Sequence, residues 1–217
     1  MLLKYKSIKM NQKLSDTIAD FLEQQNISEE RKGILQPLVD FIQEKARNNF
    51  PININFICTH NSRRSHLSQV WAQVAAAHFQ IPDVVCYSGG TEETALFPKV
   101  AETFISQGFE VIKISSDPNP VYAIKFDKNS SPIIGFSKKY DHPFNPDSAF
   151  AAVMTCSQAD GGCPFIAGAE KRIPVTFEDP KISDNTPEQT KIYAERSLEI
   201  ASEMFFVFSQ IKIEDAT

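Results

Sequence analysis

Apolar residues recur along this chain with two different periods, and together they predict strands that alternate with helices. Alternating or unbroken short apolar runs indicate strands, and apolar residues three or four positions apart indicate amphipathic helices. The predicted strands cover 52–57, 84–87, 121–126, 133–136, 150–155 and 173–177. The predicted helices lie within 1–26, 28–50, 65–78, 97–107 and 187–211.

Strands that alternate with helices favour a parallel sheet, which binds ligands at the carboxyl ends of its strands. We therefore predict an α/β fold, a three-layer sandwich with a central, mostly parallel sheet, over residues 51–217. Residues 1–50 form an N-terminal helical extension that covers this domain or, alternatively, makes a dimer surface. In the extension, Ser28 is a candidate N-cap and Pro37 should kink or restart the second helix. Thr186 is the expected N-cap of the last helix.

The segments 121–126 and 133–136 flank a turn-forming stretch and fit a β-hairpin, an unusual element between parallel strands. Aromatic residues are frequent in and after it. They favour a small satellite core over a substrate lid. The aromatic residues are Tyr122, Phe126, Phe136, Tyr140 and Phe144.

Composition narrows the class of protein. The 217 residues are 42% hydrophobic and 23% charged, which is ordinary for a globular chain with one sizeable core. A net charge of -5 gives no indication of nucleic-acid binding. No apolar run reaches the roughly 18 residues that span a membrane, and the first residues lack the features of a signal peptide. We expect a cytoplasmic protein that does not bind membranes.

The stretch ICTHNSRRS at 57–65 follows the first strand and leads into a helix. Its C-x5-R spacing places Cys58 at the floor of a loop where backbone N–H groups, the helix dipole and Arg64 all favour negative charge. We expect Cys58 to be a thiolate that attacks a bound oxyanion, with Ser65 bonded to the loop or the sulfur. The alternative is a buried, inert cysteine. The candidate oxyanion-binding loop comprises Thr59, His60, Asn61, Ser62, Arg63 and Arg64.

Two further cysteines, Cys156 and Cys163, follow the strand at 150–155 with six residues between them. With Cys58 they suggest a relay in which each disulfide is attacked by the next thiolate. Two core cysteines, or two of four zinc ligands, are the alternatives. We predict no metal site, because no C-x2-C pair is present and the histidines lack ligand spacing. Cys86 lies inside a strand and is expected to serve packing.

Asp179, held by Pro180 on a stiff turn after the last predicted strand, could donate a proton to a departing oxygen. An ordinary Asp-Pro turn is the alternative, and these residues alone leave the choice open.

Three separated pieces resemble the thioredoxin-coupled arsenate reductases, which share the fold and anion loop of the low-molecular-weight protein tyrosine phosphatases. They are ICTHNSRRS at 57–65, MTCSQADGGCP at 154–164 and KRIPVTFEDP at 171–180. The resemblance extends over about 52–212 and implies a Rossmann- or flavodoxin-like sandwich. The middle piece discriminates between the two branches, because it looks like the redox pair of the reductases.

The resemblance implies a role for each matched residue. Cys58 corresponds to the nucleophile, Arg64 to the oxyanion-binding arginine and Ser65 to the hydroxyl that helps to stabilise the thiolate. Asp179 matches the general acid. Cys156 and Cys163 match the second and third relay cysteines. Thioredoxin would be the reductant, and no cofactor is needed.

Two segments depart from the resemblance: the N-terminal extension and an insertion at about 119–145. The insertion could admit a larger phospho-substrate or block thioredoxin docking. Two other functions therefore stay open. One is a protein tyrosine phosphatase that hydrolyses phosphotyrosine through a cysteinyl-phosphate intermediate. The other is a non-catalytic, redox-sensing module that binds oxyanions. The sequence leaves the oligomeric state open.

Overall fold

The computed structural model describes residues 10–162 and 165–213 and contains a four-stranded parallel sheet. The strands are β1 (Ile52–Cys58), β2 (Val84–Gly90), β6 (Phe150–Met154) and β7 (Ala169–Pro174), and their order across the sheet is β2-β1-β6-β7. All neighbouring pairs run parallel. The predicted α/β fold with a parallel sheet is confirmed, and β1 and β6 are its two central strands.

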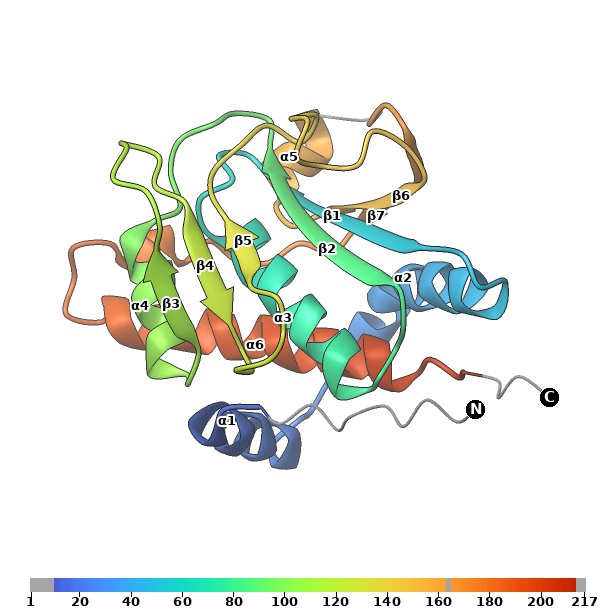
Figure 1. Cartoon of the computed structure of the whole chain (residues 1–217), viewed down its shortest axis with the longest axis horizontal. Helices are drawn as coiled ribbons and strands as arrows, with labels where there is room; N and C mark the ends of the chain where they lie inside the picture. Colours follow the sequence, from blue (N-terminus) through green and yellow to red (C-terminus); the bar gives the residue numbers. More distant parts are fainter. Residues whose placement is uncertain (1–9, 163–164, 214–217) are drawn as a thin grey trace.

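Alternation along the strands divides the core between the two faces of the sheet. The larger cluster contains Ile54, Phe56 and Val153, together with the apolar sides of α1 (Gln12–Glu23), α2 (Glu29–Arg47), α3 (Arg64–His78) and α6 (Gln189–Ser209). The smaller cluster contains Ile57 and Met154 and is closed by α5 (Ser157–Gly162) and nearby loops. Figure 1 shows this layering, with α6 in red running beneath the sheets.

A second sheet of three antiparallel strands lies beside the first (Figure 1). It consists of β3 (Glu110–Lys113), β4 (Tyr122–Lys125) and β5 (Ile133–Gly135), and it follows α4 (Pro98–Ser106). The predicted hairpin is β4 and β5. The sequence pattern did not predict β3, because none of its four residues is buried and its apolar signal is short.

Two glutamines of α3 bond to β2, the edge strand that faces the second sheet. The amide of Gln73 donates to the Val84 carbonyl at 3.0 Å and accepts from the Cys86 N–H at 2.9 Å. The Gln69 amide donates to the carbonyls of Cys86 at 3.1 Å and Ile134 at 3.4 Å. These side chains therefore take the place of a neighbouring strand along this edge.

The N-terminal helices share the main core, since Leu14 of α1 and Leu35 of α2 belong to the larger cluster. Ser28 caps α2, as predicted, because its hydroxyl accepts from the Arg31 N–H at 3.2 Å. Of the two effects expected of Pro37, a kink or a restart, the restart is wrong, because a single α2 spans the proline. Among the described residues, no helix has the length and apolar character needed to cross a membrane.

Two element boundaries differ from the prediction. The last strand of the sheet was predicted at 173–177, but β7 begins earlier, at Ala169, and ends at Pro174. After it, the N–H groups of Val175 and Phe177 still donate to the carbonyls of Met154 and Thr155 at the end of β6. Thr186 is not the N-cap of α6. Its hydroxyl donates to the Ser183 carbonyl at 2.8 Å, inside the turn that precedes the helix.

Candidate active site at the end of β1

The loop between β1 and α3 carries the candidate nucleophile at its base. Cys58 is the last residue of β1, and its sulfur lies 3.1 Å from the Ser65 hydroxyl oxygen in the first turn of α3. The Asn61 amide donates to the same oxygen at 2.9 Å. Because this oxygen already accepts a bond from Asn61, the Ser65 hydrogen is free to be donated to the sulfur.

The backbone carbonyls of the loop are all bonded to groups outside it. The Thr59 carbonyl accepts from the Glu92 N–H at 2.8 Å, and the His60 carbonyl accepts from the Ser137 hydroxyl at 3.0 Å. The next two carbonyls accept as well: that of Asn61 from His66 at 2.9 Å, and that of Ser62 from Phe97 at 3.0 Å. With these carbonyls engaged elsewhere, the interior of the loop is left to N–H groups, as an anion site requires.

The tight loop depends on Asn61 and Gly90. Asn61 has a φ of 45°, in the left-handed region that asparagine tolerates better than most residues, and its side-chain oxygen accepts from the Lys138 N–H at 2.9 Å. Gly90, at the end of β2, passes directly below the loop. A Cβ there would lie 2.7 Å from the Thr59 oxygen and 2.8 Å from the Asn61 nitrogen, so only glycine fits.

Arg64 and Asp179 meet above this loop. The Arg64 guanidinium donates to the Asp179 carboxylate at 2.5 Å and to the Phe177 carbonyl at 2.9 Å. Both side chains line one small pocket, together with Cys58, His60, Ser62 and Arg63. Asp179 also accepts from the Lys181 N–H at 3.0 Å, as the N-cap of the short 3-10 helix η1 (Pro180–Ser183). A carboxyl group and a guanidinium thus flank the opening above the sulfur.

The guanidinium of Arg63 is directed at other residues. It donates to the Asp184 carboxylate and to the Tyr193 hydroxyl, both at 2.6 Å, and lies 4.1 Å from the centre of the Phe97 ring. Any contribution of Arg63 to anion binding therefore falls to its backbone. The His60 ring is half exposed and lies 3.3 Å from the Glu92 carboxylate.

Cys156 lies beside the same loop. Its sulfur is fully buried, 3.4 Å from the Thr59 hydroxyl, and accepts from the Ala159 N–H at 3.3 Å. The adjacent strand ends bring it there, since Thr155 N–H donates to the Ile57 carbonyl at 2.7 Å. Cys163 lies outside the described residues. Among residues 10–162 and 165–213, no three histidine, cysteine or acidic side chains gather as a metal site would need.

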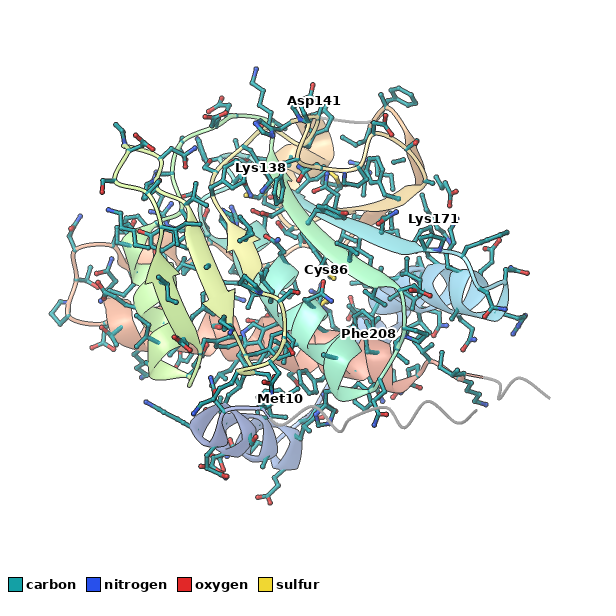
Figure 2. The ribbon with its side chains drawn as sticks, in the orientation of Figure 1. Met10, Cys86, Lys138, Asp141, Lys171 and Phe208 are labelled. Atoms are coloured by element: carbon teal, nitrogen blue, oxygen red, sulfur yellow. The ribbon has the colours of Figure 1, made fainter. Side chains whose placement is uncertain are left out.

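Cys86 is separate from this site. It lies within β2, well below the end of the strand that Lys138 approaches (Figure 2). Burial raises the pKa of the Cys86 thiol, which disfavours the reactive thiolate. A packing role, as the sequence predicted, agrees with this placement.

Lys138 is a buried residue next to the loop. Its ammonium lies 4.4 Å from the centre of the Phe136 ring, 5.3 Å from that of the Phe144 ring and 3.5 Å from the Ser88 hydroxyl oxygen. Within the described parts of the chain, no carboxylate lies within ion-pairing distance of it. Burial lowers the pKa of Lys138 to about 7. The sequence around Lys138 gives no indication that this lysine is buried.

His66 links Lys138 to the loop. Its Nδ1 lies 3.2 Å from the Ser88 oxygen, and its Nε2 lies 2.9 Å from the Asn61 carbonyl oxygen. Burial, reinforced by the charge of Lys138, lowers the pKa of His66 to about 3. A neutral imidazole that donates from Nε2 and accepts at Nδ1 satisfies both bonds.

We expect replacement of Lys138 by methionine to stabilise the protein at neutral pH and to change how stability depends on pH. The unfolded chain keeps this proton up to the ordinary pKa of 10.5, whereas the folded chain releases it above about 7. Wild-type stability should therefore rise with pH across this window, by at most about 1.4 kcal/mol per unit. The penalty is fully present below pH 7, where Lys138→Met should gain roughly 2 to 5 kcal/mol.

Urea unfolding of wild type and variant between pH 6 and 9 measures this difference. Lys139, the exposed neighbour, provides the control, since Lys139→Met should leave both the stability at pH 7 and the slope unchanged. Equal slopes for wild type and Lys138→Met would contradict the assignment of a buried, destabilising cation.

Comparison with known proteins gives sequence matches to arsenate reductases. No protein-family model matches the chain. "Arsenate reductase 2" from Staphylococcus haemolyticus is 29% identical over 128 residues, which cover 58% of this chain and 77% of the relative. An arsenate reductase from Staphylococcus aureus strain Newman is 30% identical over 128 residues, with the same coverage.

Among solved structures, a low-molecular-weight phosphotyrosine phosphatase from Vibrio cholerae is similar to 73% of this chain, with a TM-score of 0.48 and 11% identity over 94% of that protein. The Staphylococcus match is the stronger finding, because its identity of 30% extends over 77% of the relative. The chain belongs to the family of the arsenate reductases and low-molecular-weight protein tyrosine phosphatases.

Proposed function

We propose that the protein is an arsenate reductase that reduces arsenate to arsenite through the thiols of Cys58, Cys156 and Cys163, with thioredoxin as the final reductant. One observation carries the proposal: the Cys156 sulfur lies 3.4 Å from the hydroxyl of Thr59, which is the residue directly after Cys58. A hydrolase needs no second thiol at this point. A reductase requires one, because two electrons must come from sulfur to arsenic.

The first step uses the pocket at the end of β1. Arsenate enters among the loop N–H groups, and the Arg64 guanidinium turns from Asp179 to the oxyanion. The Cys58 sulfur attacks arsenic and an oxygen leaves as water, with a proton from Asp179. The product is an arsenic(V) ester of Cys58.

The second step makes a disulfide. The Cys156 sulfur gives up its bond from the Ala159 N–H and attacks the Cys58 sulfur. The electron pair of the sulfur–arsenic bond passes to arsenic, which departs as arsenite. Cys163 then attacks Cys156, which frees Cys58 and leaves a Cys156–Cys163 disulfide. Thioredoxin reduces this disulfide with its own dithiol. Such a cycle suits the reducing cytoplasm, where we place the protein.

Disulfide mapping after a single exposure to arsenate tests this proposal. The fully reduced protein is mixed with arsenate, quenched with an alkylating reagent, digested and analysed by mass spectrometry. We expect a Cys58–Cys156 disulfide followed by a Cys156–Cys163 disulfide, and continuous arsenite production when thioredoxin and its reductase are present. Inorganic phosphate is the control and should give neither disulfide, since thiols do not reduce it. Arsenate that leaves all thiols reduced would overturn the proposal.

The second candidate function is hydrolysis of phosphotyrosine through a cysteinyl-phosphate. The position of Asp179 favours it as well, because a carboxyl group next to Arg64 could protonate a phenolic leaving group. Rapid turnover of phosphotyrosine peptides together with an absence of arsenate-dependent disulfides would select this function.

A further inference from the structure

Two consecutive arginines of the loop hold the two ends of one short helix. The helix η1 begins after its N-cap Asp179 and ends at its C-cap Asp184. Arg64 pairs with Asp179 at 2.5 Å, and Arg63 pairs with Asp184 at 2.6 Å. The segment that carries the candidate general acid is therefore tied to the loop at both ends.

The pair at the far end belongs to a larger group of contacts. The Tyr193 hydroxyl of α6 donates to Asp184 at 2.6 Å and accepts from Arg63 at 2.6 Å. Gln189 also donates to Asp184, at 3.1 Å, and the Tyr193 ring stacks on the Phe97 ring at 5.8 Å. Arg63 and Asp184 expose only 13% and 15% of their side chains, so solvent weakens this pair less than a surface pair.

The charge state of Asp184 is fixed by these contacts. Burial alone raises its pKa, but bonds from Tyr193 and Gln189 and the charge of Arg63 outweigh burial, so the pKa lies below its ordinary value. The carboxylate therefore stays charged over the range in which the enzyme would work. The two ends of η1 differ in one respect: Arg64 must release Asp179 to bind an oxyanion, whereas nothing in the reaction displaces Arg63.

We propose that Arg63, Asp184 and Tyr193 form a clamp that positions the Asp179 carboxyl group during turnover. While Arg64 holds the oxyanion, Asp179 keeps its bond from the Lys181 N–H, and its place is set by η1. The clamp anchors η1 at that stage. The three are positioning residues, and this inference rests on the proposed role of Asp179 as proton donor.

Leaving-group dependence tests the clamp, because a misplaced acid slows only reactions that need its proton. Phenyl phosphate has a leaving group that requires protonation, whereas p-nitrophenyl phosphate departs readily without it. Asp184→Asn and the milder Tyr193→Phe should lower kcat/KM for phenyl phosphate about tenfold or more and change kcat/KM for p-nitrophenyl phosphate by less than about threefold. Inhibition by inorganic phosphate should be unchanged. Asp40→Asn, on the exposed side of α2, is the matched control.

A double variant makes the result decisive. In an Asp179→Asn background, Asp184→Asn should cause no additional loss with phenyl phosphate, since the clamp acts through Asp179. Equal losses with both substrates, or an additive loss in the double variant, would overturn the clamp.

A readout without turnover separates this inference from the proposed function. In the presence of inorganic phosphate, hydrogen exchange at the Asp184 amide, which donates to the Lys181 carbonyl at 3.0 Å, should be slow in wild type and about tenfold faster in Tyr193→Phe. Equal exchange in the two proteins would also overturn the clamp. A wild type that does not reduce arsenate would instead defeat the proposed function, whatever the exchange measurement shows.

Discussion

Cys58→Ser should lose arsenate reduction and aryl phosphate hydrolysis together, each by at least about a thousandfold. Both reactions begin with attack by the same sulfur, and a serine hydroxyl is a far weaker nucleophile without a neighbouring base. In the structure, the Ser65 hydroxyl lies within hydrogen-bonding distance of this sulfur, and its oxygen accepts a bond from the Asn61 amide. Steady-state assays with arsenate and with p-nitrophenyl phosphate measure the two losses.

Binding should survive this substitution. The loop carbonyls stay bonded to groups outside the loop whatever atom occupies position 58, so isothermal titration should still detect inorganic phosphate. Cys86→Ala is the matched control, because Cys86 packs inside β2, and this variant should retain both activities. Residual arsenate turnover of more than a few per cent in Cys58→Ser would exclude this sulfur as the nucleophile.

Cys156→Ser should separate the two chemistries. Reduction needs a second thiol to attack Cys58, so we expect thioredoxin-coupled arsenate turnover to fall by at least about a thousandfold. Hydrolysis of an aryl phosphate needs only water after the first step, so it should persist. Serine is close in size to cysteine and can keep bonds to the Thr59 hydroxyl and the Ala159 N–H, which should preserve the loop.

The same variant also discriminates between the candidate functions. Mass spectrometry of Cys156→Ser after arsenate treatment should find no disulfide at Cys58. If the variant reduced arsenate at the wild-type rate, the relay would be wrong and another electron donor would have to be sought. If wild type and variant both hydrolysed phosphotyrosine rapidly and neither reduced arsenate, the phosphatase function would be favoured.

Local sequence was sufficient to predict the strand, the loop and the helix at 52–78. Cys58, Arg64 and Ser65 lie within a few residues of one another, and short-range geometry dictates that they meet. The parallel sheet followed from the order of apolar runs. The proximity of Cys156 to the loop was also foreseen, because it follows a strand that ends at the same edge. The assigned roles of these residues stay predictions until they are measured.

Contacts between distant segments could not be predicted in this way. Arg63 was expected to bind oxyanions because of its position in the loop, and nothing local reveals that Asp184 and Tyr193, far along the chain, engage its side chain. Lys138 reaches the loop through the insertion, and its burial depends on Phe136, Phe144 and Ser88 together. In each case the decisive partner is set by tertiary packing, which composition and period do not encode.

The glutamine contacts on β2 have a consequence for self-association. A bare outer strand offers its peptide groups to any other chain and invites intermolecular β-pairing. Gln73 occupies a donor and an acceptor of β2 with one side-chain amide and so closes that stretch to a foreign strand. Concentrated solutions of Gln73→Leu should therefore form aggregates more readily than those of the natural protein.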